Sequence, residues 1–158
     1  MRVEYINPFV TSAVDVLSEL LHGDVTRGEL SLKESSQPVL GVAVIVALTG
    51  QVEGRLVMAM DEPTSLAVAA ALNGQELEQM DELTRATVTE VANMIAGRAT
   101  TALADLGYQF DISPPVLLTG DNMTVAADSL EALVVPIDIG IGRLELNVAL
   151  RDRVPEAR

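Results

Sequence analysis

The stretch VAVIVALTGQVEGRLVMAM, residues 42–60, decides the fold class of this chain. Two runs rich in Val, Ala, Leu and Met flank the turn residues Thr49, Gly50 and Gln51. β-Branched residues on both sides of a short turn predict an antiparallel hairpin. The first run is apolar throughout, which is typical of a strand buried on both faces.

A second hairpin is expected over residues 131–150, EALVVPIDIGIGRLELNVAL, around Gly140 and Gly142. Pro136 lies within its first run and has no backbone N–H to donate, so it must sit at a sheet edge or a bulge. Shorter strands are predicted within three other segments, where a double proline interrupts the second: ELSLKE (29–34), DISPPVLLTGDN (111–122) and MTVAAD (123–128).

Three helices are expected between these strands. Apolar residues recur at helical spacing over residues 7–22. Asp61 can cap a short alanine-rich helix, SLAVAAAL, that Asn73 and Gly74 would close. Asp81 can cap a much longer helix that runs to Leu106 and ends at Gly107.

The order of these elements is repeated along the chain. Residues 8–60 and 81–150 each read as a helix, a short strand and a hairpin, and Gly-Arg-Leu occurs at 54–56 and at 142–144. This order suggests an internal pseudo-repeat. We therefore expect an α/β fold with a single, mainly antiparallel sheet and two long helices packed on it. Residues 1–152 would form one domain, and residues 153–158 a flexible tail.

Composition excludes several classes of function. The formal net charge of −13 repels nucleic-acid phosphates and anionic lipid heads, and only 3% of the residues are aromatic. The chain has no cysteine and a single histidine, His22, so thiol catalysis and thiolate zinc sites are excluded and no metal site is expected. Glu4, Asn7 and Pro8 interrupt the apolar run that a signal peptide would need, which favours a cytoplasmic protein.

The long helix has two distinct faces. Its outward face carries Glu90 and Asn93 among the small residues Ala86, Gly97 and Thr101, where a solvated helix would carry Lys, Glu and Gln. Small side chains leave room for another protein's backbone, although a solvated polar pair is the common meaning of a bare Glu-x-x-Asn. The inward face is predicted to pack on the sheet and consists of Val88, Val91, Ala92, Ile95, Ala99, Ala102, Leu103 and Leu106.

Residues 89–122, TEVANMIAGRATTALADLGYQFDISPPVLLTGDN, resemble the signature region of the CheX-like chemotaxis phosphatases, relatives of CheC and FliY. The Glu-x-x-Asn is followed by Met-Ile-x-Gly and then by Gly-Tyr and Asp-Ile-Ser-Pro-Pro, which is far more specific than Glu-x-x-Asn alone. The resemblance implies dephosphorylation of a phosphorylated CheY-like response regulator. Asn93 would orient the attacking water and Glu90 would bind a partner lysine.

The resemblance also implies what the chain does not supply. Mg²⁺ would come with the phosphorylated partner, so no cofactor of its own is expected. The corresponding part of the first helix, INPFVTSAV at residues 6–14, has no Glu-x-x-Asn, which indicates a one-site protein. A homodimer formed through sheet edges is implied, with residues 134–140, VVPIDIG, as a candidate edge. The alternative is a non-catalytic adaptor that docks a receiver domain or a flagellar or motility component.

Overall fold

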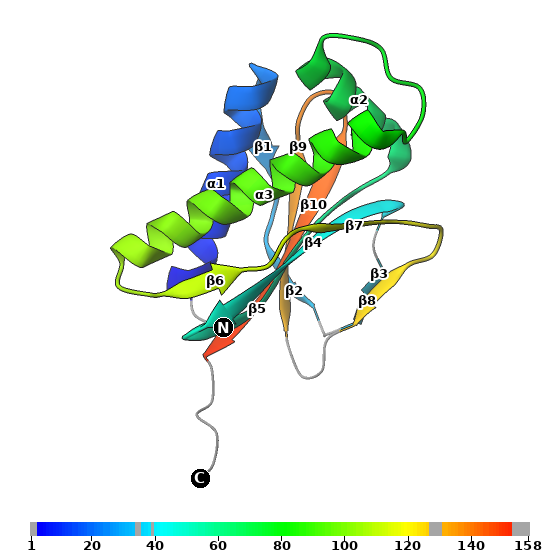
Figure 1. The fold of residues 1–158 in the computed structure, drawn as a ribbon. Helices are drawn as coiled ribbons and strands as arrows, with labels where there is room; N and C mark the ends of the chain where they lie inside the picture. Colours follow the sequence, from blue (N-terminus) through cyan, green and yellow to red (C-terminus); the bar gives the residue numbers. More distant parts are fainter. Residues whose placement is uncertain (1–2, 34–35, 39, 127–130, 153–158) are drawn as a thin grey trace.

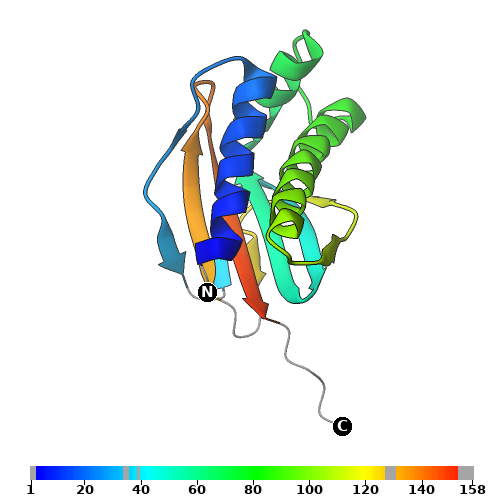
Figure 2. The same ribbon diagram turned by 90° about the vertical axis from the view of Figure 1, so that its left-hand side faces the viewer.

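The computed structural model describes residues 3–33, 36–38, 40–126 and 131–152. An eight-stranded antiparallel sheet has the order β1-β9-β10-β5-β4-β6, and β2 and β7 add to its two sides by pairing with β9 and β4. Helices α1 and α3 lie side by side against one face of this sheet (Figures 1 and 2). A separate two-stranded ladder joins β3 (Ser36–Pro38) to β8 (Thr124–Ala126).

The first predicted hairpin is confirmed as β4 (Val42–Gly50) and β5 (Val52–Met60). The strand β4 is buried on both faces, as its apolar sequence predicted. Val42, Val44 and Val46 belong to the core beneath the helices. Ala43 and Ile45 instead pack on the opposite face with Val57, Ala59 and Met123.

The second hairpin is confirmed as β9 (Ala132–Asp138) and β10 (Arg143–Asp152). Pro136 lies at a bulge, because β1 (Thr26–Arg27) pairs beyond it and β2 (Ser31–Lys33) pairs before it. The Gly28 N–H donates to the Pro136 carbonyl at 2.7 Å. The strand β9 is therefore paired on both sides, so the prediction that residues 134–140 form an open edge was wrong.

The helix α1 (Val3–Leu21) begins four residues before its predicted start. The prediction placed Pro8 near the first turn, whereas the apolar stripe already includes Tyr5 and Ile6, which are buried. A proline inside the helix removes the hydrogen bond to the carbonyl four residues earlier, that of Glu4, and its ring crowds that carbonyl, at a cost of about 3 kcal/mol. Burial of two large side chains outweighs that loss.

Capping fixes the other two helices as predicted. The helix α2 (Glu62–Asn73) has Asp61 as its N-cap and Gly74, in a left-handed conformation, as its C-cap. The helix α3 (Glu82–Asp105) has Asp81 as its N-cap and Leu106 as its C-cap. Leu106 is 62% exposed, so its placement on the buried stripe was wrong: the helical phase ends before it.

The two halves of the chain show the predicted duplication. Each half consists of a long helix, three short strands and a hairpin, and α2 stands between the halves. The short strands exchange partners, since β1 and β2 pair with β9 of the second half while β6 (Phe110–Ile112) and β7 (Val116–Thr119) pair with β4 of the first. The Gly-Arg-Leu tripeptides do not correspond, because Gly54 is inside β5 whereas Gly142 precedes β10.

The duplication extends to single positions of the helices. When Glu4 is matched to Glu90, six buried residues of α1 fall on six buried residues of α3 at the same interval. These pairs are Tyr5 and Val91, Ile6 and Ala92, Phe9 and Ile95, Val10 and Ala96, Ala13 and Ala99, and Leu17 and Leu103. The two helices therefore dock on the sheet with the same register.

Candidate functional site on α3

The five residues singled out on the long helix lie on its outward face. Glu90, Ala86 and Thr101 are exposed, and Asn93 and Gly97 are partly exposed. Glu90 and Asn93 are three residues apart and so lie on adjacent turns of the same side. The structure thus brings together the residues that the sequence had grouped.

The start of α3 is held firmly. The Thr84 N–H donates to the Asp81 carboxylate at 2.9 Å, and this hydrogen bond lowers the pKa of Asp81 below its ordinary value. The Thr84 hydroxyl is buried and donates to the Gln79 carbonyl at 3.0 Å. This network fixes where the helix begins. The buried side chains of α3, among them Val91 and Ile95, turn the Glu90 side outward.

A salt bridge ties α3 to α1. The Arg98 guanidinium donates to both oxygens of Glu19, at 2.9 and 2.5 Å. This bidentate contact raises the pKa of Arg98 and lowers that of Glu19. Arg98 lies two turns after Glu90, and its charge is already engaged by Glu19.

A shallow groove of about 350 Å³ opens beside Glu90. Leu20 from α1, Leu72 from α2 and Met94 from α3 are among the residues that line it. The Asn73 amide donates to the Thr87 hydroxyl at 2.9 Å and joins α2 to α3 at the rim. Sequence reasoning missed this groove, because no local pattern brings residues 20, 72 and 94 together.

Glu90 and Asn93 have side chains available for an external partner. Within residues 3–33, 36–38, 40–126 and 131–152, neither side chain has a hydrogen-bond or ion-pair partner. The Thr101 hydroxyl, by contrast, donates to the Gly97 carbonyl at 3.0 Å. A carboxylate and an amide are therefore the free polar groups that the predicted site offers.

Gly97 has no structural requirement inside this chain. A Cβ added at Gly97 would meet no atom within 4 Å, and its backbone is helical. Glycine in a helix costs about 1 kcal/mol relative to alanine. The small residue therefore leaves open surface next to Asn93, and the helix alone gains nothing from it.

The described part of the chain contains no group of three or more His, Asp and Glu side chains that could hold a metal. An amide can orient a water molecule, and a carboxylate can bind an ammonium group. Neither group is itself an activated nucleophile, so the pair cannot form a reactive site alone. It can instead complete a reactive site that another molecule brings.

The Asp-Ile-Ser-Pro-Pro segment has a structural role. The Ser113 N–H donates to the Ala47 carbonyl at 2.9 Å, and the Ser113 hydroxyl accepts from the Ala47 N–H at 2.9 Å. These bonds attach the turn between β6 and β7 to β4. The interpretation of this segment as a rigid turn is therefore favoured over contact with a partner.

The chain matches a known protein family over more than half of its length. The model of the family described as chemotaxis phosphatase CheX matches residues 42–138. The chain belongs to the CheX family. The CheY-P phosphatase CheX of Thermotoga maritima is 26% identical over 140 residues, which cover 88% of this chain and 90% of that protein.

Solved structures of CheX-family and CheC-like proteins share the fold. A CheX-CheY-BeF3-Mg²⁺ complex from Borrelia burgdorferi contains a chain 39% identical to this one, with a TM-score of 0.84 and coverage of 96% of this chain and 100% of that chain. A CheC-like superfamily protein from Shewanella sp. PV-4 is 27% identical, with a TM-score of 0.87 and coverage of 96% and 99%.

One prediction about α1 was wrong. The first helix was expected to lack a Glu-x-x-Asn, because its start was placed at residue 7. The helix begins at Val3, and Glu4-Tyr5-Ile6-Asn7 is such a pattern within it. In the register that matches the buried residues of the two helices, Glu4 and Asn7 correspond to Glu90 and Asn93.

The described helices include none that is long and apolar enough to cross a membrane.

Proposed function

We propose that this CheX-family protein accelerates hydrolysis of the aspartyl phosphate on a CheY-like receiver domain. The observation that carries the proposal is the pair of unengaged polar groups, Glu90 and Asn93, on adjacent turns of an exposed helix face in a chain of this family. A relative in complex with CheY, BeF3 and Mg²⁺ supports a receiver domain as the partner.

The reaction needs little from this chain. Water attacks phosphorus, the bond from phosphorus to the aspartyl oxygen breaks, and inorganic phosphate leaves with the water's proton. The released aspartate needs no protonation near neutral pH. The Asn93 amide would accept a hydrogen bond from the water and donate one to a phosphoryl oxygen, which aligns the nucleophile.

Glu90 would act as the anchor. Its carboxylate would bind a lysine of the receiver, and Arg98 does not compete for it because Arg98 is held by Glu19. Ala86, Gly97 and Thr101 would lie against the receiver surface. Mg²⁺ would enter with the receiver, whose own carboxylates hold it. The reaction would take place in the cytoplasm, beside this partner.

Kinetics of receiver dephosphorylation test the proposal. A phosphorylated CheY-like receiver from the same organism is mixed with catalytic amounts of wild type, Asn93→Ala or Glu90→Ala. We expect faster decay with wild type and a loss of about 10²–10³ in rate for Asn93→Ala, by analogy with other single oriented donors. Glu90→Ala should mainly raise KM, since binding of a lysine is lost.

Binding separates this function from that of an adaptor. An adaptor would hold the receiver with equal affinity in Asn93→Ala and would leave the decay rate unchanged even for the wild type. Arg85→Ala is a matched control, because Arg85 is exposed on α3 but points its guanidinium toward the Met80 carbonyl at 3.1 Å. Full phosphatase activity in Asn93→Ala would refute the water-orienting role.

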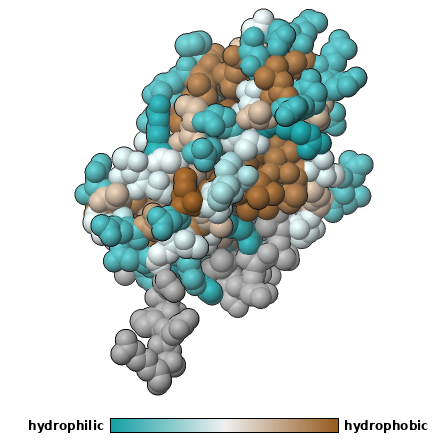
Figure 3. All heavy atoms as spheres, in the orientation of Figure 1, coloured by the Kyte–Doolittle hydropathy of each residue, from teal (hydrophilic) through white to brown (hydrophobic). Residues whose placement is uncertain are grey.

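A homodimer through a sheet edge is part of the proposal, with β7 as the edge. Among the described strands β7 pairs only with β4, and Val116 and Leu118 on it are 54% and 43% exposed. Figure 3 shows apolar surface on this side of the molecule. Val116→Lys should convert a dimer to a monomer in sedimentation, whereas Leu32→Lys on β2 should not. A monomeric wild type would exclude the dimer.

A further inference from the structure

The proposed reaction gives no role to the groove beside Glu90, although this groove lies within the proposed contact surface. Its volume is about 350 Å³, near the lower end of the roughly 300–1,000 Å³ of pockets that hold small molecules. Glu90 and Ala86 are exposed and belong to its lining, as does the buried Val91. A protein partner that binds the Glu90 carboxylate therefore also covers the groove.

The lining of the groove favours an apolar occupant. The Thr87 hydroxyl is already engaged, since it donates to the Leu83 carbonyl at 2.8 Å and accepts from the Asn73 amide at 2.9 Å. Within the described part of the chain, the Glu90 carboxylate is thus the one polar side chain of the lining without a partner. Burial of an unpaired polar group is costly. The remaining side chains of the lining are all apolar: Leu20, Leu72, Ala86, Val91 and Met94.

The helix α2 contributes to this groove from a fixed position. The Asn73 amide donates to the Thr87 hydroxyl at 2.9 Å and to the Ala69 carbonyl at 2.8 Å, which holds the end of α2 against α3. Gly74 then ends α2 in a left-handed conformation. Hydrogen bonds therefore set the place of Leu72 before any partner arrives. A preformed groove binds a side chain at a smaller entropic cost than one that must first be ordered.

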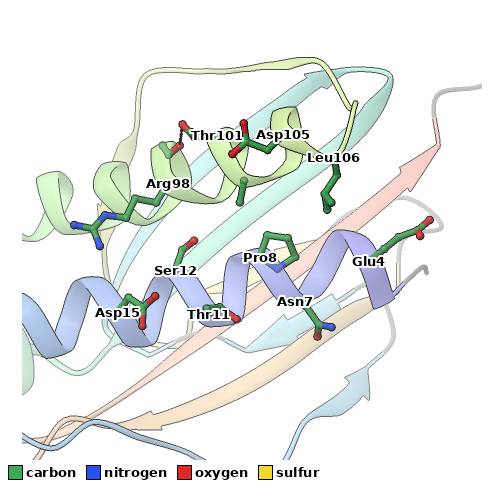
Figure 4. Close-up of a pocket in the computed structure, with 12 residues that line it drawn as sticks. Glu4, Asn7, Pro8, Thr11, Ser12, Asp15, Arg98, Thr101, Asp105 and Leu106 are labelled. Carbon is green, nitrogen blue, oxygen red and sulfur yellow. Dashed lines mark hydrogen bonds between the residues drawn. The ribbon is translucent and has the colours of Figure 1, made fainter.

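A second hollow, of about 680 Å³, lies at the other end of the crevice between α1 and α3. Asp15 and Asp105 belong to its lining (Figure 4). Arg98 points from α3 toward α1 in the same view, and its salt bridge with Glu19 crosses the crevice between the two hollows. An apolar group in the larger hollow would remove water from carboxylates, and those carboxylates repel a phosphoryl group. A phosphorylated partner with an apolar side chain therefore fits the groove beside Glu90 better.

We propose that the groove beside Glu90 receives an apolar side chain of the receiver domain, next to the lysine that Glu90 binds. This inference rests on the proposed function and names what selects the receiver. Leu72 and Met94 contact the apolar side chain, and a receiver with a charged residue there binds weakly, because that charge is buried without a partner. The groove therefore determines which receiver is dephosphorylated, whereas Asn93 determines how fast.

Filling the groove tests the proposal without removing a core side chain. In Ala86→Phe the added ring comes from an exposed helix position. Binding of a CheY-like receiver from the same organism, activated with beryllofluoride and Mg²⁺, is measured by fluorescence anisotropy. Decay of the phosphorylated receiver is measured in parallel. We expect Kd and KM to rise by about tenfold or more, while kcat changes by less than about twofold.

Ala104→Phe is the matched control. Ala104 is also an exposed alanine of α3, and it belongs to the lining of neither hollow. It lies eighteen residues after Ala86, which is about 27 Å along the helix and a whole number of turns. The same ring at this position should leave Kd and KM unchanged. Circular dichroism on thermal unfolding verifies that both variants fold.

A double-mutant cycle identifies the occupant. Leu72→Ala is combined with alanine substitutions of the exposed apolar residues near the phosphorylation site of the receiver. For one of these residues the effects on Kd should be non-additive by about fivefold or more, because both changes remove the same contact. Strict additivity for every such residue would overturn the proposal, even if Leu72→Ala weakens binding through a change in structure.

The outcomes separate this inference from the proposed function. If the wild type accelerates decay and Ala86→Phe binds and turns over the receiver equally well, the groove lies outside the contact and the proposed function stands. If Ala86→Phe instead changes only the sedimentation of the protein, a second copy of this chain occupies the groove and the receiver does not. If the wild type accelerates no receiver, the proposed function fails and this inference fails with it.

Discussion

The outward faces of α1 and α3 carry the same polar pair, and their surroundings differ. Beside Glu90, α2 supplies Leu72 as a wall, and the carboxylate has no partner in the described chain. Beside Glu4 there is no inserted helix, and Tyr108 holds the carboxylate. The core preserves the twofold register of both helices, while the surface residues and the insertion differ between the halves. Internal symmetry therefore duplicates a position without duplicating its environment.

The difference shows which part of a duplicated fold is constrained. Six buried pairs of α1 and α3 match in burial although most of them differ in side chain, as with Tyr5 and Val91. Packing against the sheet requires apolar residues at these positions and tolerates changes of identity when volume is redistributed. No such constraint acts on exposed residues, so each half is free to acquire its own partner surface.

The largest expected effect separates the two asparagines. Asn93→Asp should lose about 10²–10³ in receiver dephosphorylation, since an acid of the same shape cannot donate to the phosphoryl oxygen and repels it. Asn7→Asp should change the rate by less than about twofold, because Asn7 lies on α1, outside the proposed site on α3. Single-turnover decay of the phosphorylated receiver measures both. Equal losses would show that the two faces contribute equally.

The next comparison concerns Pro8, which stands where α3 has Met94. Pro8→Ala should restore a hydrogen bond to the Glu4 carbonyl and relieve the ring contact, and so stabilise the protein by up to about 3 kcal/mol. Met94→Ala should destabilise it through lost packing at the matching position. Urea unfolding followed by circular dichroism measures both. A destabilised Pro8→Ala would mean that the proline is needed for how α1 begins.

The N-cap of α3 offers a smaller effect with a pH signature. Asp81→Ala should lower Tm by a few degrees, because the Thr84 N–H loses its acceptor. The folded-state pKa of Asp81 lies below its unfolded value of about 3.9, so its stabilisation is present above that value and is lost as pH falls through the folded pKa. Thermal melts are measured from about pH 2 to about pH 7. The Tm values of wild type and Asp81→Ala should converge at the acid end of this range. A constant difference would contradict the role of the carboxylate.

The smallest expected effect is at Gly97, which matches Thr11 of α1. Gly97→Ala should raise stability by about 1 kcal/mol, since its Cβ meets no atom within 4 Å. The same methyl group should raise KM for the receiver with kcat little changed, because it stands on the proposed contact surface. Thr11→Ala is the matched control and should leave KM unchanged. An unaltered KM in Gly97→Ala would remove this residue from the contact.

Local patterns predicted most of the fold. The caps Asp61 and Asp81, the two hairpins and the bulge at Pro136 follow from short-range rules about hydrogen-bond donors and turn residues. The exchange of short strands between the halves did not follow, because pairing partners far apart in sequence leave no local trace. This is why β9 was mistaken for an edge strand.

The candidate site divides in the same way. Glu90, Asn93 and their small neighbours could be grouped from helical spacing alone, since they lie on one helix. The groove formed by Leu20, Leu72 and Met94 could not, because three helices contribute to it. The pair Glu4 and Asn7 was visible in the sequence, but placing the helix start at residue 7 excluded Glu4 from it.

The exchange of short strands also has a consequence for biosynthesis. The pairing of Arg27 with Ile137 closes a very long loop, and such long-range contacts slow folding. At about 5–20 residues per second, the ribosome needs roughly 5–20 s to make the chain between these two strands. During that interval the apolar hairpin of β4 and β5 lacks β10, the strand that pairs with β5. The first half of the chain therefore reaches its native stability only once β9 and β10 of the second half are present.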